Sequence, residues 1–318
     1  MKHIVAMILI ACVLGAAGCA KVVGPYYLEQ EQYEDGIRVL GEQFRENPGD
    51  ASSAYYVGRF YLAMDRPKDG LAYLEKAVAL EPENADYVFW TGVAHWAMLD
   101  FERERAAYER AISLDPKHIS AHLYLGHGNM DRGAWKEALA HYDRVVELDA
   151  YNPEALFNRA RALKELGRNN EEIAAWKRFL EYYPDGSMAM TATEQLNLQG
   201  DFSYRNHIIG KRNVTLKGMA FKSGTDVLNA DSKASLQVLS AMMQVNETLT
   251  VHIVSFAAGD AALARGRAEA VRDYVLAGNP GIGPKRLPLS WFGTAEKVEV
   301  EESVFSLDES VTFITDVR

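Results

Sequence analysis

Cysteine is the scarcest residue in this chain, and its distribution removes several kinds of chemistry. Only Cys12 and Cys19 are present, both within the first twenty residues. The remainder of the sequence cannot form a disulfide, a cysteine-ligated zinc site or a thiol nucleophile.

An excess of positive charge is also missing. The formal net charge is −10, and almost all of it lies in residues 1–200. Such a surface repels nucleic acid and anionic lipid headgroups, so we expect neither as a direct partner. After residue 20 no apolar run is long enough to predict a membrane-spanning helix.

The N-terminus has the pattern of a targeting segment. A basic start, MKH, precedes the apolar run IVAMILIACVLGAAG, which has the length of a signal-peptide core. The run ends in AAGC, which resembles the bacterial lipobox and implies removal of residues 1–18 and a lipid on Cys19. Residues 19–23 would then be a lipidated tether. The alternative is an ordinary secretory signal with a chance cysteine near its end.

The residue after the lipidated cysteine bears on localisation. Ala20 stands where lipoproteins retained in the inner membrane often carry aspartate. The resemblance therefore implies a protein held by lipid in the bacterial outer membrane and facing the periplasm.

A 34-residue period is the dominant pattern of the chain. Prolines recur at one position of this period: Pro48, Pro82, Pro116 and Pro184. Small residues recur at another position: Gly58, Gly92, Gly126 and Ala160. A period of this length indicates stacked helix hairpins, in which the small residue allows close approach and the proline follows the second helix.

The pattern resembles the tetratricopeptide repeat (TPR) family, which implies an all-α solenoid over residues 24–200. The predicted units are a degenerate repeat at 24–50, full repeats at 51–84, 85–118, 119–152 and 153–186, and a capping helix at about 187–200.

In the TPR family the first helices of the repeats line a concave groove that binds a protein or peptide. The resemblance assigns twelve residues to this groove: Tyr55, Arg59, Leu62, Phe89, Val93, Trp96, Leu123, His127, Met130, Phe157, Arg161 and Lys164. Aromatic and aliphatic side chains with a few cationic groups suit an acidic peptide. The alternative is that several of these residues pack between repeats or against a second domain.

No metal or cofactor is expected. His118, His122 and His127 have helical spacing, but no glutamate completes a metalloprotease motif, and packing or solvated histidines are the favoured interpretation. We find no nucleophile elbow and no convergent pair of carboxylates, so we do not expect an enzyme.

Beyond residue 200 the period changes. We expect a linker at 201–212 and an α+β domain at 213–318, with the element order β-α-β-α-β-β and helices on one side of a mixed sheet. The segments FKSGTDVLNADSKASLQVLSAMM, VHIVSF and RAEAVRDYVL resemble the OmpA-like domain, which binds peptidoglycan.

In that family an aspartate and an arginine bind the two charged groups of diaminopimelate. Here Ala258 takes the aspartate position and only Arg267 remains, with Asp260 as a possible substitute. Losing one of two paired charges removes much of the affinity of such a site. We therefore expect weak or lost binding through Arg267 and Asp260, with a solvated Arg267 as the simplest alternative.

Together these observations predict a lipid-anchored periplasmic scaffold that binds partner proteins through its TPR groove, as part of an envelope assembly. The alternative function is a genuine peptidoglycan tether of the outer membrane.

Overall fold

The computed structural model describes residues 20–315. Cys12 and the predicted lipid-attachment residue Cys19 lie outside this range. The chain divides into two compact units, of which the first ends at Ala155 and the second begins at Leu156. Each unit is described separately.

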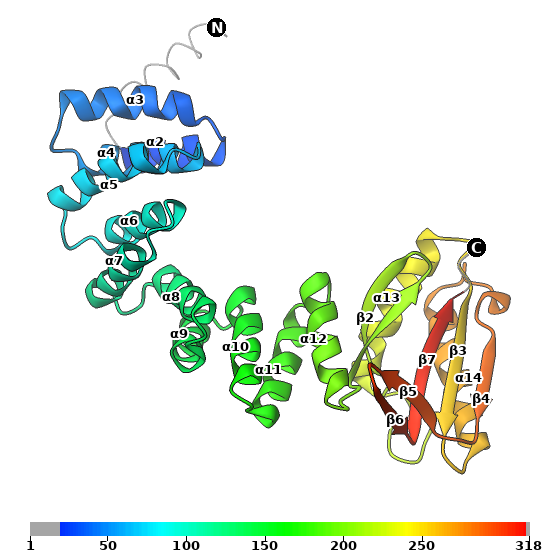
Figure 1. The fold of residues 1–318 in the computed structure, drawn as a ribbon. Helices are drawn as coiled ribbons and strands as arrows, with labels where there is room; N and C mark the ends of the chain where they lie inside the picture. The colour runs from blue at the N-terminus through cyan, green and yellow to red at the C-terminus, as the bar shows by residue number, and fades with distance from the viewer. Residues whose placement is uncertain (1–19, 316–318) are drawn as a thin grey trace, which may run out of the picture. The chain divides into compact units, whose positions relative to one another are not determined.

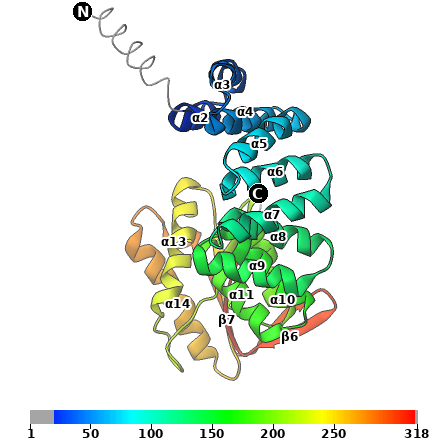
Figure 2. The ribbon, with the colours of Figure 1, turned by 90° about the vertical axis from the view of Figure 1, so that its left-hand side faces the viewer.

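The first unit consists of helix hairpins stacked side by side (Figures 1 and 2). Its helices are α2 (Ala20–Glu29), α3 (Tyr33–Glu46), α4 (Ala51–Ala63), α5 (Pro67–Leu80), α6 (Ala85–Ala97), α7 (Phe101–Leu114), α8 (Ile119–Asp131) and α9 (Trp135–Leu148). Helix α10 (Pro153–Glu165) runs across the division between the units. The pairs α4–α5, α6–α7 and α8–α9 coincide with the predicted repeats at 51–84, 85–118 and 119–152.

The start of the first unit differs from the prediction. Residues 20–23, expected in a tether, are the first turn of α2, and Ala20 is buried. Ala20 packs in one apolar cluster with Leu40, Val57 and Phe60. This helix was not predicted, because its residues directly follow the signal-like apolar run in the sequence and include Pro25.

Polar residues at the end of each proline-containing turn cap the first helices of the hairpins. The side chain of Asp50 accepts a hydrogen bond from the backbone N–H of Ser53, and Asn84 does the same for Tyr87. His118 replaces these residues in α8, where its Nδ1 accepts from the backbone N–H of Ala121 at 3.1 Å. Such caps stabilise helix N-termini by about 1 kcal/mol each.

The small residues that recur every 34 residues lie where the two helices of a hairpin are in contact. A methyl group added to Gly92 would stand 2.5 Å from the ring of Tyr108, and one added to Gly126 would stand 2.7 Å from the ring of Tyr142. Both tyrosines are fully buried. The periodic glycine is therefore required by close helix packing, as the sequence predicted.

The second unit continues with helices and then changes to strands. It contains α11 (Asn169–Tyr182), α12 (Ser187–Leu198), β1 (Tyr204–Ile209), β2 (Arg212–Lys217), α13 (Ala230–Val245), β3 (Val251–Ala257), α14 (Ala261–Gly278), the 3-10 turn η1 (Pro284–Arg286), β4 (Leu289–Phe292), β5 (Glu296–Val300), β6 (Ser303–Leu307) and β7 (Glu309–Thr315). A mostly helical repeat region is thus followed by a small β-containing region.

The linker predicted at 201–212 is wrong. Strand β1 occupies most of it and pairs antiparallel with β2. Asn197 of α12 donates hydrogen bonds to the carbonyl groups of Asp201 and Tyr204, at 2.9 and 2.8 Å. The side-chain amide of Asn206 donates to the carbonyl of Met190. The last helix of the repeat region is therefore joined to the β region by hydrogen bonds and packing rather than by a free connection.

The three-stranded sheet has the order β4-β3-β7, with β4 parallel and β7 antiparallel to β3. Helices α13 and α14 lie side by side on one face of this sheet (Figures 1 and 2). Leu239, Ile253, Val271 and Phe313 belong to the core between the helices and the strands. This mixed sheet with helices on one side is the arrangement that the sequence predicted.

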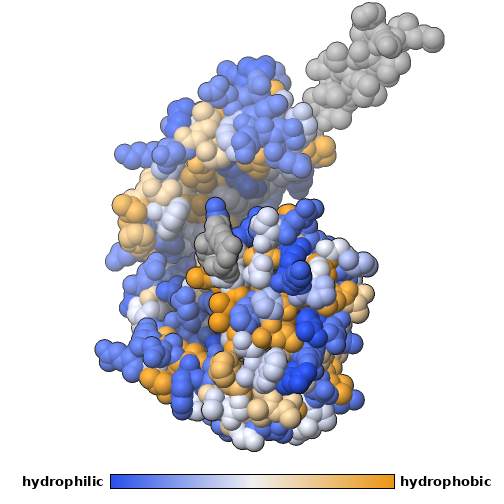
Figure 3. All heavy atoms as spheres, turned by 90° about the vertical axis from the view of Figure 1, so that its right-hand side faces the viewer, coloured by the Kyte–Doolittle hydropathy of each residue, from blue (hydrophilic) through white to orange (hydrophobic). Residues whose placement is uncertain are grey.

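Three strands were not predicted. Besides β1, the hairpin β5–β6 forms within the acidic segment 296–307. Arg205 of β1 attaches this hairpin through two hydrogen bonds to the carboxylate of Glu296, at 2.8 and 2.9 Å. Figure 3 shows that hydrophobic residues also reach the surface of the second unit. The exposed ones include Trp291, Phe292 and Ile314. Within residues 20–315, no helix has the length and hydropathy needed to cross a bilayer.

Candidate protein-binding groove

Four of the twelve predicted groove residues are buried in the repeat core. Tyr55, Phe89, Leu123 and Met130 each expose less than a tenth of their surface. The ring of Phe89 stacks on that of Tyr108 at 5.2 Å. Large aromatic side chains at helical spacing fill the space between neighbouring hairpins, so these four predicted contacts to a partner are corrected to packing residues.

The cationic side chain of Arg59 lies in an aromatic pocket of the first unit. Its guanidinium carbon is 4.0 Å from the ring centroid of Trp90 and 5.6 Å from that of Tyr55. One terminal nitrogen donates a hydrogen bond to the hydroxyl of Tyr55 at 3.3 Å. The buried Nε has no hydrogen-bond partner among the described residues. Trp90 was not among the predicted groove residues of α6, which are Phe89, Val93 and Trp96.

No carboxylate forms an ion pair with Arg59 within residues 20–315. The nearby Asp86 is engaged by His118, whose Nε2 lies 3.1 Å from a carboxylate oxygen. This hydrogen bond lowers the pKa of Asp86, and the charges of His118 and Arg59 act in the same direction. Arg59 is thus a half-buried cation with aromatic contacts and an unfilled hydrogen-bonding position.

Exposed apolar side chains surround the turn between α6 and α7. Trp96 is 53% exposed, Leu99 73% and Phe101 53%. Of these, only Trp96 was predicted as a groove residue. Exposed aromatic residues are frequent anchors in protein interfaces.

The remaining predicted residues of the first unit are half-buried. Leu62 lies against α5, where it is within 3.2 Å of the position that a methyl group on Gly70 would take. Val93 packs against the apolar cluster that includes Val88. His127 lies 3.7 Å from the carboxylate of Glu154.

The three predicted residues of the second unit differ in exposure. Phe157 is half-buried against the rings of Trp176 and Phe179, at 5.1 and 5.3 Å. Arg161 and Lys164 are exposed. They donate hydrogen bonds to the side chains of Asn158 and Gln195, at 3.3 and 2.6 Å.

The histidines of helical spacing have separate partners. His118 caps α8, and Nδ1 of His122 lies 3.1 Å from Nδ1 of His141 on α9. Burial lowers the pKa of His122, and burial together with His122 lowers the pKa of His141 to about 4. Among residues 20–315 no group of three or more histidine, cysteine or acidic side chains is arranged to hold a metal ion.

In the second unit, Arg267 is buried and already paired. Only 2% of the residue is exposed. Its Nε donates to the carbonyl of Thr225 at 3.0 Å, and a terminal nitrogen lies 2.8 Å from the carboxylate of Glu309. The guanidinium also lies over the ring of Phe221 at 4.8 Å. The alternative of a solvated Arg267 is therefore wrong.

Asp260 does not complete a site with Arg267. Its carboxylate caps α14 by accepting a hydrogen bond from the backbone N–H of Leu263 at 2.8 Å. Seven residues along a helix separate the two positions by about 10 Å in rise. The structure therefore does not bring together the two residues expected to bind peptidoglycan.

The stacked helix hairpins define the first part of the chain as an α-solenoid. Tetratricopeptide repeat models match residues 58–119 and 154–186, and a TPR repeat model matches residues 129–167. These matches confirm the TPR repeats predicted from the 34-residue period.

Three solved structures are similar to part of this chain. The PilF protein of Pseudomonas aeruginosa is 15% identical, with a TM-score of 0.54 over 59% of this chain and 86% of that one. The chain is also similar to MamA, at 21% identity and a TM-score of 0.46 over 50% of this chain and 94% of that one. A third similar structure is YrrB, titled a TPR protein with an unusual peptide-binding site, at 17% identity and a TM-score of 0.46 over 58% of this chain and 97% of that one.

The likeness to PilF shows the helical-repeat fold alone. No curated protein matches the sequence.

Proposed function

We propose that this chain is a lipid-anchored scaffold that faces the periplasm from the outer membrane and binds a partner protein through its TPR groove. In this proposal it is not an enzyme and uses no cofactor. Residues 213–318 form an OmpA-like domain with weakened or lost peptidoglycan binding, and the whole protein belongs to an envelope assembly.

The observation that carries the proposal is the environment of Arg59. Arg59 is a cation enclosed by Trp90 and Tyr55, and its buried Nε lacks a partner among residues 20–315. An acidic side chain that binds here would stabilise it. The exposed rings of Trp96 and Phe101 supply apolar area to the same kind of ligand. An acidic peptide with apolar residues fits both features.

The direct test is crosslinking in intact cells. A photoreactive residue in place of Trp96 should capture one reproducible partner, identified by mass spectrometry. Arg59→Gln should lower the yield of that adduct by about tenfold, because a charge-assisted hydrogen bond contributes roughly 1.5–3 kcal/mol.

Arg66 provides the matched control for Arg59. It also stacks on a ring, that of Tyr61 at 4.7 Å, but it already pairs with Asp69 at 2.8 Å. Arg66→Gln should leave the adduct unchanged. Equal yields from both variants and the unmodified chain would reject an acidic partner at Arg59.

The lipid anchor has a separate test. Radiolabelled palmitate should enter the chain, and Cys19→Ser should abolish both the label and recovery in the membrane fraction. A soluble Cys19→Ser protein that still carries label would contradict attachment at this residue.

The weakened peptidoglycan contact is tested with purified cell-wall sacculi. The engagement of Arg267 by Glu309 and Thr225 favours weak retention, because a ligand carboxylate must displace an existing ion pair. Strong retention that free diaminopimelate competes away would instead favour the alternative function, a genuine peptidoglycan tether.

A further inference from the structure

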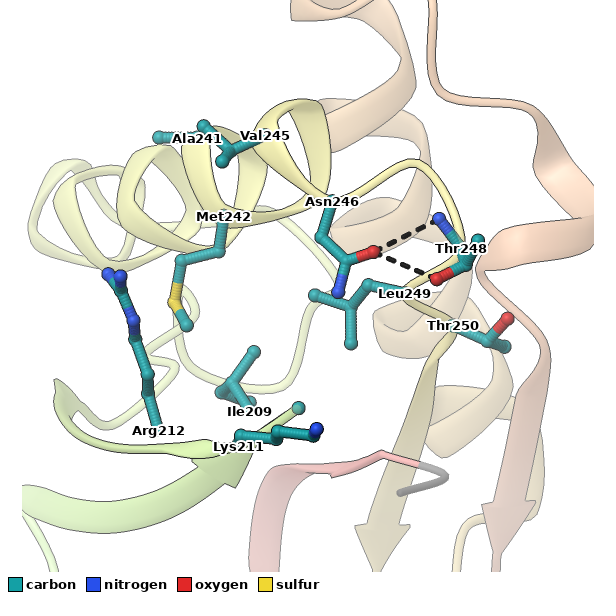
Figure 4. A pocket seen from close by; sticks show the side chains of 11 residues that line it. Ile209, Lys211, Arg212, Ala241, Met242, Val245, Asn246, Thr248, Leu249 and Thr250 are labelled. Carbon is teal, nitrogen blue, oxygen red and sulfur yellow. Dashed lines mark hydrogen bonds between the residues drawn. The ribbon is translucent and has the colours of Figure 1, made fainter. Parts of the chain in front are cut away.

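The second unit contains a cavity that none of the predicted functions uses. Its volume is about 760 Å³. It lies between the turn that joins β1 and β2, the last turn of α13 and the segment that leads into β3 (Figure 4). This volume falls in the range of sites that enclose a small ligand or a short peptide segment.

The floor of the cavity is apolar. Ile209 and Leu249 are almost completely buried, and Met242 packs against the same core. Figure 4 shows the side chains of Ile209 and Met242 pointing toward one another from opposite sides of the cavity. A ligand can therefore bury an apolar side chain here without displacing a polar protein group.

Two adjacent cations stand at the edge of this floor. Lys211 lies in the turn between β1 and β2, Arg212 is the first residue of β2, and both are exposed. Neither side chain forms an ion pair or a hydrogen bond with any residue in the described range 20–315. In a chain with a net charge of −10, two neighbouring cations without a carboxylate partner are a distinct positive feature.

The negative end of α13, which would repel an anion, is already neutralised. The guanidinium of Arg286 donates to the carbonyl groups of Met243, Asn246 and Leu249, at 2.7, 2.6 and 3.0 Å. A cation at this position offsets the partial negative charge of a helix C-terminus. Arg286 therefore weakens the repulsion that an anionic ligand beside Lys211 and Arg212 would meet from this helix end.

The polar side of the cavity selects the kind of ligand. The side-chain oxygen of Asn246 accepts hydrogen bonds from the backbone N–H and the hydroxyl of Thr248, which leaves its amide nitrogen as a donor. Thr248 and Thr250 also line this side (Figure 4). A long alkyl chain would remove these polar groups from water without replacing their hydrogen bonds, whereas a peptide backbone supplies both donors and acceptors.

We propose that this cavity binds an acidic peptide segment of a partner protein. One apolar side chain of the segment lies on the floor formed by Ile209, Met242 and Leu249. Carboxylates beside it pair with Lys211 and Arg212. This site is separate from the TPR groove and does not depend on the function proposed for the groove.

The test follows the methyl group of Met242 by NMR in the full chain labelled with ¹³C-methyl methionine. The probe is the acetylated peptide amide Leu-Asp-Glu, and the matched neutral probe is Leu-Asn-Gln. The acidic peptide should shift the Met242 signal saturably and leave that of Met130, in the repeats, unchanged. The neutral peptide should bind at least about tenfold more weakly.

Substitutions at the exposed turn make the test specific. The double variant Lys211→Gln, Arg212→Gln should weaken binding of the acidic peptide by about tenfold or more. Lys233→Gln removes an exposed cation of α13 outside the cavity lining and should have no effect. An unshifted Met242 signal, equal binding of both peptides, or full binding by the double variant would overturn the proposal. Tighter binding of dodecanoate than of the peptide would also overturn it, in favour of an acyl-chain site.

Discussion

Arg267 and Glu309 form an ion pair of 2.8 Å in which the cation is enclosed and the carboxylate is half exposed. The side chain of Arg267 is 3% exposed and that of Glu309 is 53% exposed. The pair joins the first turns of α14 to the start of β7. A residue expected to recognise a ligand is thus part of the packing of the second unit.

Removing the carboxylate of Glu309 should destabilise the second unit. Glu309→Gln leaves a buried cation with one carbonyl partner, so we expect a loss of about 2 kcal/mol in the free energy of unfolding, measured by urea denaturation. Glu269→Gln, which breaks the exposed pair with Arg265, should cost less than about 0.5 kcal/mol. An equal loss of unfolding free energy in the two variants would show that the burial of Arg267 does not strengthen its ion pair with Glu309.

The close helix contact at Gly92 should not tolerate a methyl group. Gly92→Ala places this methyl against the fully buried ring of Tyr108, and we expect a destabilisation of about 1–3 kcal/mol. Gly41→Ala is the matched control, because no atom lies within 4 Å of its added methyl. There the higher helix propensity of alanine should stabilise the protein by about 0.5–1 kcal/mol. Thermal unfolding should separate the two variants in opposite directions.

The hairpin β5–β6 should depend on Arg205. Its paired hydrogen bonds to Glu296 are largely shielded from solvent, with side-chain exposures of 16% and 10%. Glu296→Gln should cost about 3 kcal/mol and increase amide hydrogen exchange throughout residues 296–307. Exchange in α6 of the first unit provides the internal control, and unchanged exchange in the hairpin would contradict the assigned contact.

The stability of the first unit should fall in acid because of the His122–His141 pair. Burial and His122 hold the pKa of folded His141 near about 4, below the value of about 6.5 for an unfolded histidine. Between about pH 4 and pH 6.5 the unfolded chain therefore binds more protons than the folded chain does. The stabilising effect is complete above about pH 6.5 and is lost as the pH falls toward about 4.

Replacing His141 should remove much of this pH dependence. His141→Gln should reduce the loss of unfolding free energy between pH 7 and pH 4.5 by on the order of 2 kcal/mol, measured by circular dichroism. An undiminished loss in this variant would assign the acid sensitivity to other groups.

Much of the repeat region could be predicted because each hairpin obeys the same local constraints. The small residue at Gly92 and Gly126 follows from helix contacts that recur every 34 residues. The C-terminal sheet was predictable where strands alternate strongly, as in β3. Strands β1 and β5 were missed because both are short and contain several polar residues. The ion pair that connects them joins Arg205 and Glu296, which are far apart in sequence.

The candidate sites were less predictable than the fold. Periodicity placed Phe89 and Trp96 on the same helix face, yet one is buried and the other is exposed. The contact between Arg59 and Trp90 joins two repeats, and the cavity beside Lys211 joins a turn, a helix end and a loop. These neighbours are far apart in the sequence, so a local sequence pattern cannot predict them.

By itself, the sequence determined that this protein contains TPR repeats and a region of mixed helices and strands, because hydrophobic period and turn chemistry act over a few residues. Only the tertiary structure decided which side chains remain available. It enclosed Arg267 between Glu309, Thr225 and Phe221 and left Arg59, Lys211 and Arg212 without carboxylate partners within the described residues. Burial and pairing are properties of segments brought together from distant parts of the chain, and they separate a structural arginine from one that can bind a ligand.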